Sequence, residues 1–116
     1  RATVPEMTKK YFIEEDKGDY RIIDGVRELV SFSYLNLLDP FKTSLIRDAD
    51  VIFCRNVIIY FDREAKKKVI ESFYDKLRDG GFLLLGHSES LINISNAFAL
   101  RTLVNDMVYQ KPVRGK

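Results

Sequence analysis

Two short segments without a polar residue, residues 51–54 (VIFC) and 82–85 (FLLL), stand out in the hydrophobic pattern of this chain. Segments of this length and composition are typical of strands that are buried on both faces, as in a parallel sheet covered by helices. The residues between them are numerous enough for a helical crossover, which two parallel neighbouring strands require. The pattern therefore predicts two parallel strands at the centre of an α/β fold.

The segment between these strands has the periodicity of an amphipathic helix. Asp62 is placed to cap its first turn, and Gly80-Gly81 is expected to end it after about Arg78. Strand, helix and strand then form one right-handed βαβ unit. The apolar stripe that would face the core consists of Ala65, Val69, Ile70, Phe73 and Leu77.

Residues 1–33 are predicted to form a short helix followed by a small antiparallel β-meander. Thr3 and Glu6 have capping-box spacing for a helix over about residues 4–11. Asp24-Gly25 is typical of a type I′ hairpin turn, which needs positive φ at both positions. This meander is either an ordinary sheet edge or an interaction flap that accepts a peptide strand. Its strands are expected over residues 12–15, 20–23 and 26–32, with a first turn at 16–19.

Residues 34–116 are predicted to form the α/β part of the chain. Asn36 lies in an apolar pentad before Asp39-Pro40, and it either closes a local turn or contacts a ligand at a strand end. Residues 41–47 form a linker or a single helical turn. Near the C-terminus, Asn105-Asp106 separates two apolar segments and predicts an antiparallel hairpin that makes the sheet mixed. The hairpin strands lie within residues 97–104 and 107–111, and residues 113–116 are expected to fray.

Polar side chains directly follow both predicted parallel strands. Arg55 and Asn56 come after the first strand, and residues 86–90 (GHSES) come after the second. In open α/β sheets, ligands bind just beyond the carboxyl ends of the strands, so this edge is a candidate binding edge. The alternative is an ordinary core strand followed by an ordinary loop. His87, the only histidine, is either a hydrogen-bonded structural residue or a functional one.

Composition narrows the class of protein. With 116 residues, 46% apolar and 31% charged, the chain suits one soluble globular domain and not a disordered segment. The net charge is only +2 and both signs are mixed along the chain, so the sequence lacks the concentration of basic residues that nucleic-acid binding requires. The single Cys54 excludes an internal disulfide, and no metal site is expected. The use of a single cysteine fits a cytoplasmic setting. No segment approaches the ~20 apolar residues that span a bilayer, so membrane insertion is not expected. A chain that begins at Arg1 is expected to be a piece of a longer protein.

The segment at residues 50–62, DVIFCRNVIIYFD, followed by GGFLLLGHSESL at residues 80–91, resembles the C-terminal half of the CheR-type chemotaxis receptor methyltransferases. Upstream pieces agree in the family's order: YF at Tyr11-Phe12, VRELVSF at residues 26–32 and NLL at residues 36–38. The resemblance covers nearly the whole chain. The two long motifs are much more specific than a single glycine pattern.

The resemblance implies a partial Rossmann-like, S-adenosylmethionine-dependent methyltransferase sheet with a small antiparallel β-meander and a C-terminal antiparallel hairpin. It implies an enzyme of bacterial chemotaxis signalling that transfers a methyl group from S-adenosylmethionine to glutamate side chains, leaving S-adenosylhomocysteine. The implied partner is the cytoplasmic domain of the methyl-accepting chemoreceptors.

The resemblance also implies roles for individual residues. Tyr60 matches a tyrosine near the transferred methyl group and is the candidate catalytic residue. The residues that match cofactor contacts are Asn36 and Leu37, beside the adenosine, and Arg55 and Asn56, at the end of the central strand. A further motif near the site, without assigned roles, contains His87, Ser88 and Glu89.

Several parts of the family's pattern have no counterpart in this sequence. These are the glycine-rich loop after its first strand, the acidic residue that holds the ribose, and the N-terminal helical domain. We therefore expect this chain alone to bind cofactor weakly or not at all, to be inactive, and to self-associate through an open sheet edge. Two other functions remain as alternatives: a non-catalytic receptor-docking module built on residues 11–32, and a different Rossmann-type nucleotide binder.

Overall fold

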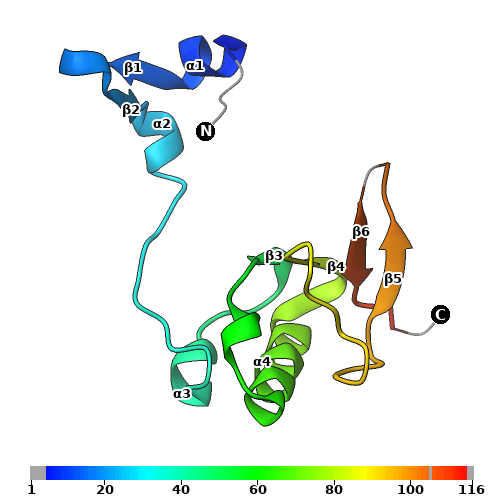
Figure 1. Ribbon diagram of the computed structural model, residues 1–116. Coiled ribbons are helices and arrows are strands. Elements are labelled where there is room, and N and C mark those ends of the chain that lie inside the picture. The colour runs from blue at the N-terminus through cyan, green and yellow to red at the C-terminus, as the bar shows by residue number, and fades with distance from the viewer. Residues whose placement is uncertain (1–4, 105, 115–116) are drawn as a thin grey trace. The chain divides into compact units, whose positions relative to one another are not determined.

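The computed structural model describes residues 5–104 and 106–114 (Figure 1). The chain divides into two compact units, Arg1–Tyr34 and Leu35–Lys116. The helices and strands belong to the α/β class that the sequence predicts. Among the described residues, no helix has the length and apolar character that crossing a membrane requires.

The first unit contains a helix and a two-stranded hairpin. Helix α1 (Pro5–Tyr11) leads into β1 (Phe12–Glu14), which pairs antiparallel with β2 (Tyr20–Ile22). The turn between the strands is a 3₁₀ helix, η1 (Asp16–Gly18). The predicted helix and first hairpin are therefore confirmed, whereas Thr3 of the expected capping box lies outside the described residues.

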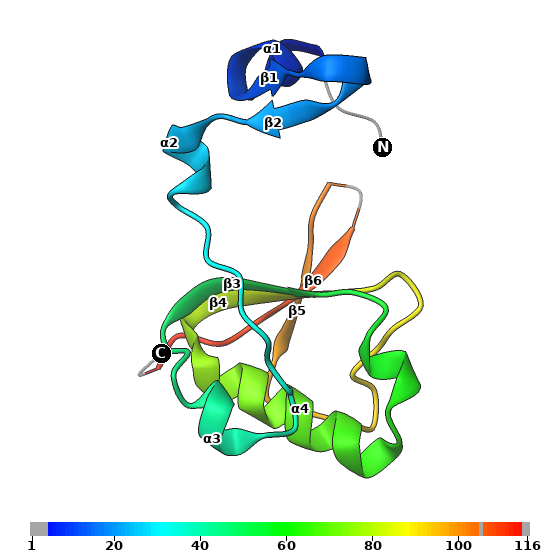
Figure 2. The same cartoon turned by 90° about the vertical axis from the view of Figure 1, so that its left-hand side faces the viewer.

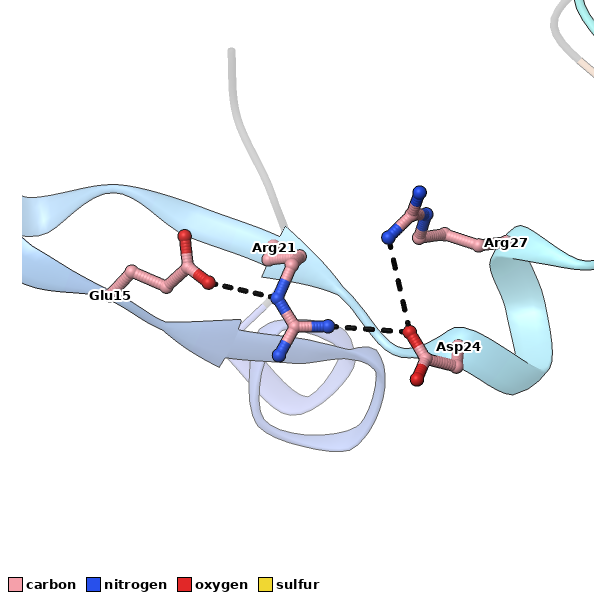
Figure 3. A network of polar contacts seen from close by, with 4 residues as sticks. All are labelled: Glu15, Arg21, Asp24 and Arg27. Carbon is pink, nitrogen blue, oxygen red and sulfur yellow. Dashed lines mark hydrogen bonds and ion pairs between the residues drawn. The ribbon is translucent and has the colours of Figure 1, made fainter.

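The second predicted hairpin, at Asp24-Gly25, is wrong. Asp24 opens a helical turn, α2 (Asp24–Arg27), and Gly25 does not have the positive φ that a type I′ turn needs. The Asp24 carboxylate lies 3.3 Å from Arg21 and 3.9 Å from Arg27, and Arg21 also binds Glu15 at 2.8 Å (Figure 3). An acidic residue in the first turn and a basic one in the last turn favour a helix. The strand expected over residues 26–32 is also wrong, because residues 26 and 27 belong to α2 and the described residues 28–32 form no strand.

The second unit is organised on a four-stranded mixed sheet. Its order is β3-β4-β6-β5, from β3 (Ala49–Cys54), β4 (Leu77–Leu85), β6 (Met107–Gln110) and β5 (Ala99–Thr102). Strands β3 and β4 are parallel, and the other two pairs are antiparallel. The parallel pair and the C-terminal hairpin are therefore confirmed. Asn105 of the hairpin turn lies outside the described residues.

Helix α4 (Arg63–Lys76) connects the two parallel strands. The Asp62 carboxylate accepts a hydrogen bond from the Ala65 amide at 2.8 Å, as the predicted cap requires. The helix lies against one face of the sheet (Figure 2). The apolar residues of its stripe belong to the core of the unit, so the amphipathic prediction is confirmed. Buried core residues of this unit include Val69, Ile70, Phe73, Leu77 and Leu83.

Gly80 and Gly81 do not end the helix as predicted, because they lie inside β4. Gly80 has a φ of +83°, a conformation that few other residues adopt. A Cβ atom on Gly81 would lie 3.1 Å from the backbone oxygen of Ala49 on β3. The two glycines therefore let β4 pass close to β3 where their register shifts.

The expectation that β3 is buried on both faces is wrong for one face. Cys54 is buried and Ile52 is half-buried, whereas Val51 is 45% exposed and Phe53 is 69% exposed. Helix α4 and the short helix α3 (Pro40–Thr43) lie on the same side of β3 and β4 (Figure 2). Among the described elements of this unit, neither helix covers the other face.

The two ends of this unit are held by hydrogen bonds, one within a helical turn and one to a residue far away in sequence. Asp39 caps α3 by accepting a hydrogen bond from the Phe41 amide at 3.0 Å, which confirms a single helical turn there. The backbone amide of Arg114 donates to the Asp79 carboxylate at 3.2 Å. This bond holds Arg114, and residues 115–116 of the tail that is expected to fray lie outside the described residues.

Candidate functional site

The carboxyl ends of β3 and β4 lie side by side. Cys54 and Leu85, the last residues of the two strands, are partners in the parallel ladder. Arg55 and Asn56 follow the first strand, and Gly86 follows the second. The structure thus confirms that the two polar segments meet at one edge of the sheet.

Glu89 joins these two strand ends. One carboxylate oxygen, Oε1, accepts hydrogen bonds from the backbone amides of Gly86 at 2.6 Å and Asn56 at 2.9 Å. The Glu89 amide in turn donates to the Gly86 carbonyl at 3.0 Å. The other oxygen, Oε2, is buried and has no hydrogen-bond partner among the described residues. We call this arrangement of Asn56, Gly86 and Glu89 the strand-end junction.

The strand-end junction is tightly packed. Asn56 has a φ of +63°, in the left-handed region that asparagine tolerates better than most residues. Gly86 is buried, and a Cβ atom there would lie 2.6 Å from Glu89 Oε1 and 3.0 Å from the Asn56 amide nitrogen. Glycine at position 86 is therefore a condition for the close approach of the two segments.

An apolar pocket of about 460 Å³ lies next to this junction, and Leu37 and Arg55 both line it. Strand β3 contributes Ile52 and Cys54, α3 contributes Thr43, and α4 contributes Phe73. Two cationic residues line it as well: Arg55, which follows β3, and Lys76, at the end of α4. The pocket can therefore take a flat apolar group with polar or anionic substituents.

The Cys54 side chain forms part of the pocket wall and is 6% exposed. Burial raises the pKa of the Cys54 thiol, and the negative charge of Glu89 raises it further. The thiol is therefore protonated at neutral pH, and Cys54 acts as a small apolar residue and not as a nucleophile.

The structure brings together only some of the residues that the sequence singles out. Asn36 uses its side-chain oxygen to accept a hydrogen bond from the Leu38 amide at 3.0 Å, so it closes a local turn beside the pocket. Tyr60 lies on the 3₁₀ helix η2 (Ile58–Tyr60), which the buried Ile58 anchors, and it is 81% exposed. In the described chain, Asn36, Asn56 and Tyr60 are not among the residues that line the pocket.

A second pocket, of about 570 Å³, lies on the side of the GHSES loop that faces the β5–β6 hairpin. His87 and Glu89 line it, together with Asp106 and Met107. His87 is exposed there. In the part of the chain that the structure describes, no three His, Cys, Asp or Glu side chains gather as a metal ion would need.

Sequence reasoning left Glu89 without a role, although it makes the central contact of the site. A glutamate can reach back to the backbone amide three residues before it, as it does in a capping box, so the spacing of Gly86 and Glu89 is a local signal for the first bond. The second bond, to Asn56, joins residues 33 positions apart, and local sequence carries no signal for it.

Comparison with known proteins places these features in a family. A family model described as "CheR methyltransferase, SAM binding domain" matches residues 2–105. The chain is 42% identical to "Chemotaxis protein methyltransferase 2" of Vibrio cholerae, over 92% of this chain and 37% of that protein. It is 37% identical to a chemotaxis protein methyltransferase of Vibrio parahaemolyticus and 33% identical to "Chemotaxis protein methyltransferase 1" of Pseudomonas aeruginosa, each over 95% of this chain and 39% of the relative. The chain thus spans about two fifths of the length of these relatives.

Proposed function

This chain belongs to the CheR methyltransferase family, and from this membership we infer that it is the C-terminal part of a bacterial S-adenosylmethionine-dependent methyltransferase. We propose glutamate side chains of methyl-accepting chemoreceptors as the substrate, with a glutamate methyl ester and S-adenosylhomocysteine as products. The cytoplasmic domain of the receptors is then the partner, and the cytoplasm is the compartment. The match supports this family over an unrelated Rossmann-type nucleotide binder or a docking module without catalysis.

The observation that carries the proposal is the placement of Arg55 and Asn56 at the carboxyl edge of the sheet. This is the edge at which open α/β sheets bind their ligands. The strand-end junction holds the backbone of both segments there, and the apolar pocket opens beside it. This arrangement supports the carboxyl edge of the sheet as the site of the family's cofactor.

The residues present fit one part of S-adenosylmethionine. The largely apolar pocket lined by Leu37 suits the faces of an adenine ring, and Asn36 is exposed beside it with amide donors. We propose that Leu37 and Asn36 hold the adenosine, and that Arg55 and Asn56 contact the cofactor at the strand end. When bound, S-adenosylmethionine supplies a methyl group that its sulfonium already activates.

Methyl transfer to a carboxylate requires little of the protein beyond alignment of the reacting groups. A glutamate carboxyl group in water has a pKa of about 4.3, so it is ionised and nucleophilic at neutral pH without a general base. The protein must orient the carboxylate and exclude water. We propose that Tyr60, exposed on η2 next to the strand end, uses its hydroxyl to position the substrate carboxylate.

The proposed cofactor site is tested by titrating S-adenosylhomocysteine into a complete methyltransferase that contains this sequence, followed by calorimetry. We expect Arg55→Ala to weaken binding by roughly tenfold or more, because the guanidinium is a charged contact. Arg47→Ala, at another exposed arginine, is the matched control. Binding by Arg55→Ala equal to that of the wild type would refute this assignment. The 116-residue chain alone is expected to bind weakly or not at all.

Self-association of the isolated chain is a separate prediction. Strand β3 is at the end of the sheet, so one of its edges has no strand partner among the described residues, and Phe53 adds an exposed apolar side chain. Unpaired edges of this kind recruit other strands, and a lysine on the edge opposes this. We expect sedimentation velocity to show association that rises with concentration and that Phe53→Lys reduces. Leu100→Lys, on the other edge strand β5, is the control; a larger effect there would place the contact at β5 instead.

A further inference from the structure

We propose that Glu89 is a positioning residue for the methyl-transfer site. Its carboxylate ties the backbone of Asn56 to the end of β4 and thereby sets where Arg55 and Asn56 present their side chains to the cofactor. This inference rests on the proposed function and gives a role to a residue of the GHSES loop.

Hydrogen bonds to Glu89 continue the connection between the two strands beyond the end of their backbone ladder. Cys54 and Leu85 are the last paired residues of β3 and β4. The backbone amides of Asn56 and Gly86 lie beyond this pair and need an acceptor outside the ladder. Glu89 Oε1 accepts from both, at 2.9 Å from Asn56 and 2.6 Å from Gly86. Hydrogen bonds to an ionised acceptor are stronger than those between neutral groups. One side chain therefore fixes the relative position of the two strand ends.

The unpaired oxygen of Glu89 argues against a role in stability alone. Oε2 is buried without a hydrogen-bond partner among the described residues, and burying an unpaired carboxylate oxygen costs free energy. The hydrogen bonds to Asn56 and Gly86 use only Oε1. Costly arrangements of this kind are concentrated at functional sites.

The backbone conformations at both strand ends fit the hydrogen bonds of the Glu89 carboxylate. Asn56 adopts a left-handed conformation at φ +63°, and Gly86 leaves room for the Glu89 side chain and the Asn56 backbone. Because the Asn56 amide belongs to the peptide group that joins it to Arg55, its bond to Glu89 also holds the backbone from which Arg55 reaches the pocket that it lines. Release of Asn56 would therefore misplace two proposed cofactor contacts at once.

Glu89 is not among the residues of the unit's main core. The most deeply buried side chains, including Val69, Ile70 and Leu83, lie between α4 and the sheet. We therefore expect a Glu89 variant to stay folded while the strand-end junction loosens, so positioning and folding can be measured separately.

The experiment compares Glu89→Ala and Glu89→Gln in the complete methyltransferase, with Glu71→Ala, an exposed glutamate on α4, as the control. We expect Glu89→Ala to weaken S-adenosylhomocysteine binding and to raise the KM for S-adenosylmethionine by roughly tenfold to a hundredfold, more than it lowers kcat. Glu89→Gln keeps an oxygen acceptor and should restore binding to within about threefold. In the 116-residue chain, the amide proton signals of Asn56 and Gly86 should move upfield in Glu89→Ala and remain close to the wild-type positions in Glu89→Gln.

Two results would overturn the positioning role: wild-type affinity in Glu89→Ala, or equal losses in the alanine and glutamine variants that follow their loss of thermal stability. Unchanged amide signals of Asn56 and Gly86 in Glu89→Ala would refute the hydrogen bonds from these two amides to Glu89. A wild-type enzyme that does not bind S-adenosylhomocysteine would instead overturn the proposed function, which distinguishes the two failures.

Discussion

Gly86→Ala is expected to open the strand-end junction and to abolish most cofactor binding. The added Cβ would lie 2.6 Å from Glu89 Oε1, closer still to Asn56 Oδ1, and 3.0 Å from the Asn56 backbone nitrogen. Side-chain atoms can move away, but the backbone of Asn56 can do so only by stretching or breaking its bond to Glu89. Overpacking of this kind costs about 1–3 kcal/mol of stability. We expect thermal unfolding of the isolated chain to shift downward, and S-adenosylhomocysteine affinity of the complete enzyme to fall by roughly tenfold to a hundredfold.

Gly25→Ala is the matched control for this variant. A Cβ atom on Gly25 meets no atom within 4 Å, and its backbone lies in the helical turn α2, where alanine is preferred to glycine. We expect unchanged or slightly higher stability and unchanged cofactor affinity. If Gly86→Ala bound S-adenosylhomocysteine as well as Gly25→Ala does, the close approach at the strand ends would have no bearing on the cofactor.

Tyr60→Phe in the complete enzyme is expected to lower turnover by roughly tenfold or more, with a much smaller effect on cofactor affinity. The variant removes only the hydroxyl, which we propose positions the substrate carboxylate. Because Tyr60 is 81% exposed, the loss of its hydroxyl should leave the folded structure unchanged. The measurement is kcat from methyl transfer to a receptor substrate, alongside the dissociation constant for S-adenosylhomocysteine.

Tyr34→Phe provides the comparison, since Tyr34 is 99% exposed and lies in the other unit of the chain. It should match the wild type in both measurements. Equal losses of turnover and of cofactor affinity in Tyr60→Phe would indicate that Tyr60 contacts the cofactor and does not position the substrate.

The local features of the second unit could be predicted because neighbouring residues determine them. A polar cap at Asp62, an apolar stripe at helical spacing and apolar segments on either side are sufficient to specify strand, helix and parallel strand. The carboxyl edge with Arg55 and Asn56 follows directly, because parallel strands place their ends at the same edge. The motifs at residues 50–62 and 80–91 also indicated the family, and the match to the family model confirms it.

Errors arose where a short sequence suits more than one structure. Asp24-Gly25 suits a hairpin turn, but it also suits the first turn of a helix, and the ion pairs of Asp24 with Arg21 and Arg27 occur with the helix. Gly80-Gly81 suits a helix end, but the close approach of β4 to Ala49 places both glycines in a strand. Local ion pairs accompany the helical turn at Asp24, whereas at Gly80-Gly81 a contact with a distant strand decided between two local structures.

The sequence by itself determined the order and type of the central elements, the sheet edge that carries the candidate site, and the family. Only the tertiary structure decided how that edge is held together. The bond from Glu89 to Asn56 spans 33 residues, and the room for it depends on a missing Cβ at Gly86. Periodicity and turn chemistry act over a few residues, whereas such a contact exists only after β3 and β4 have paired.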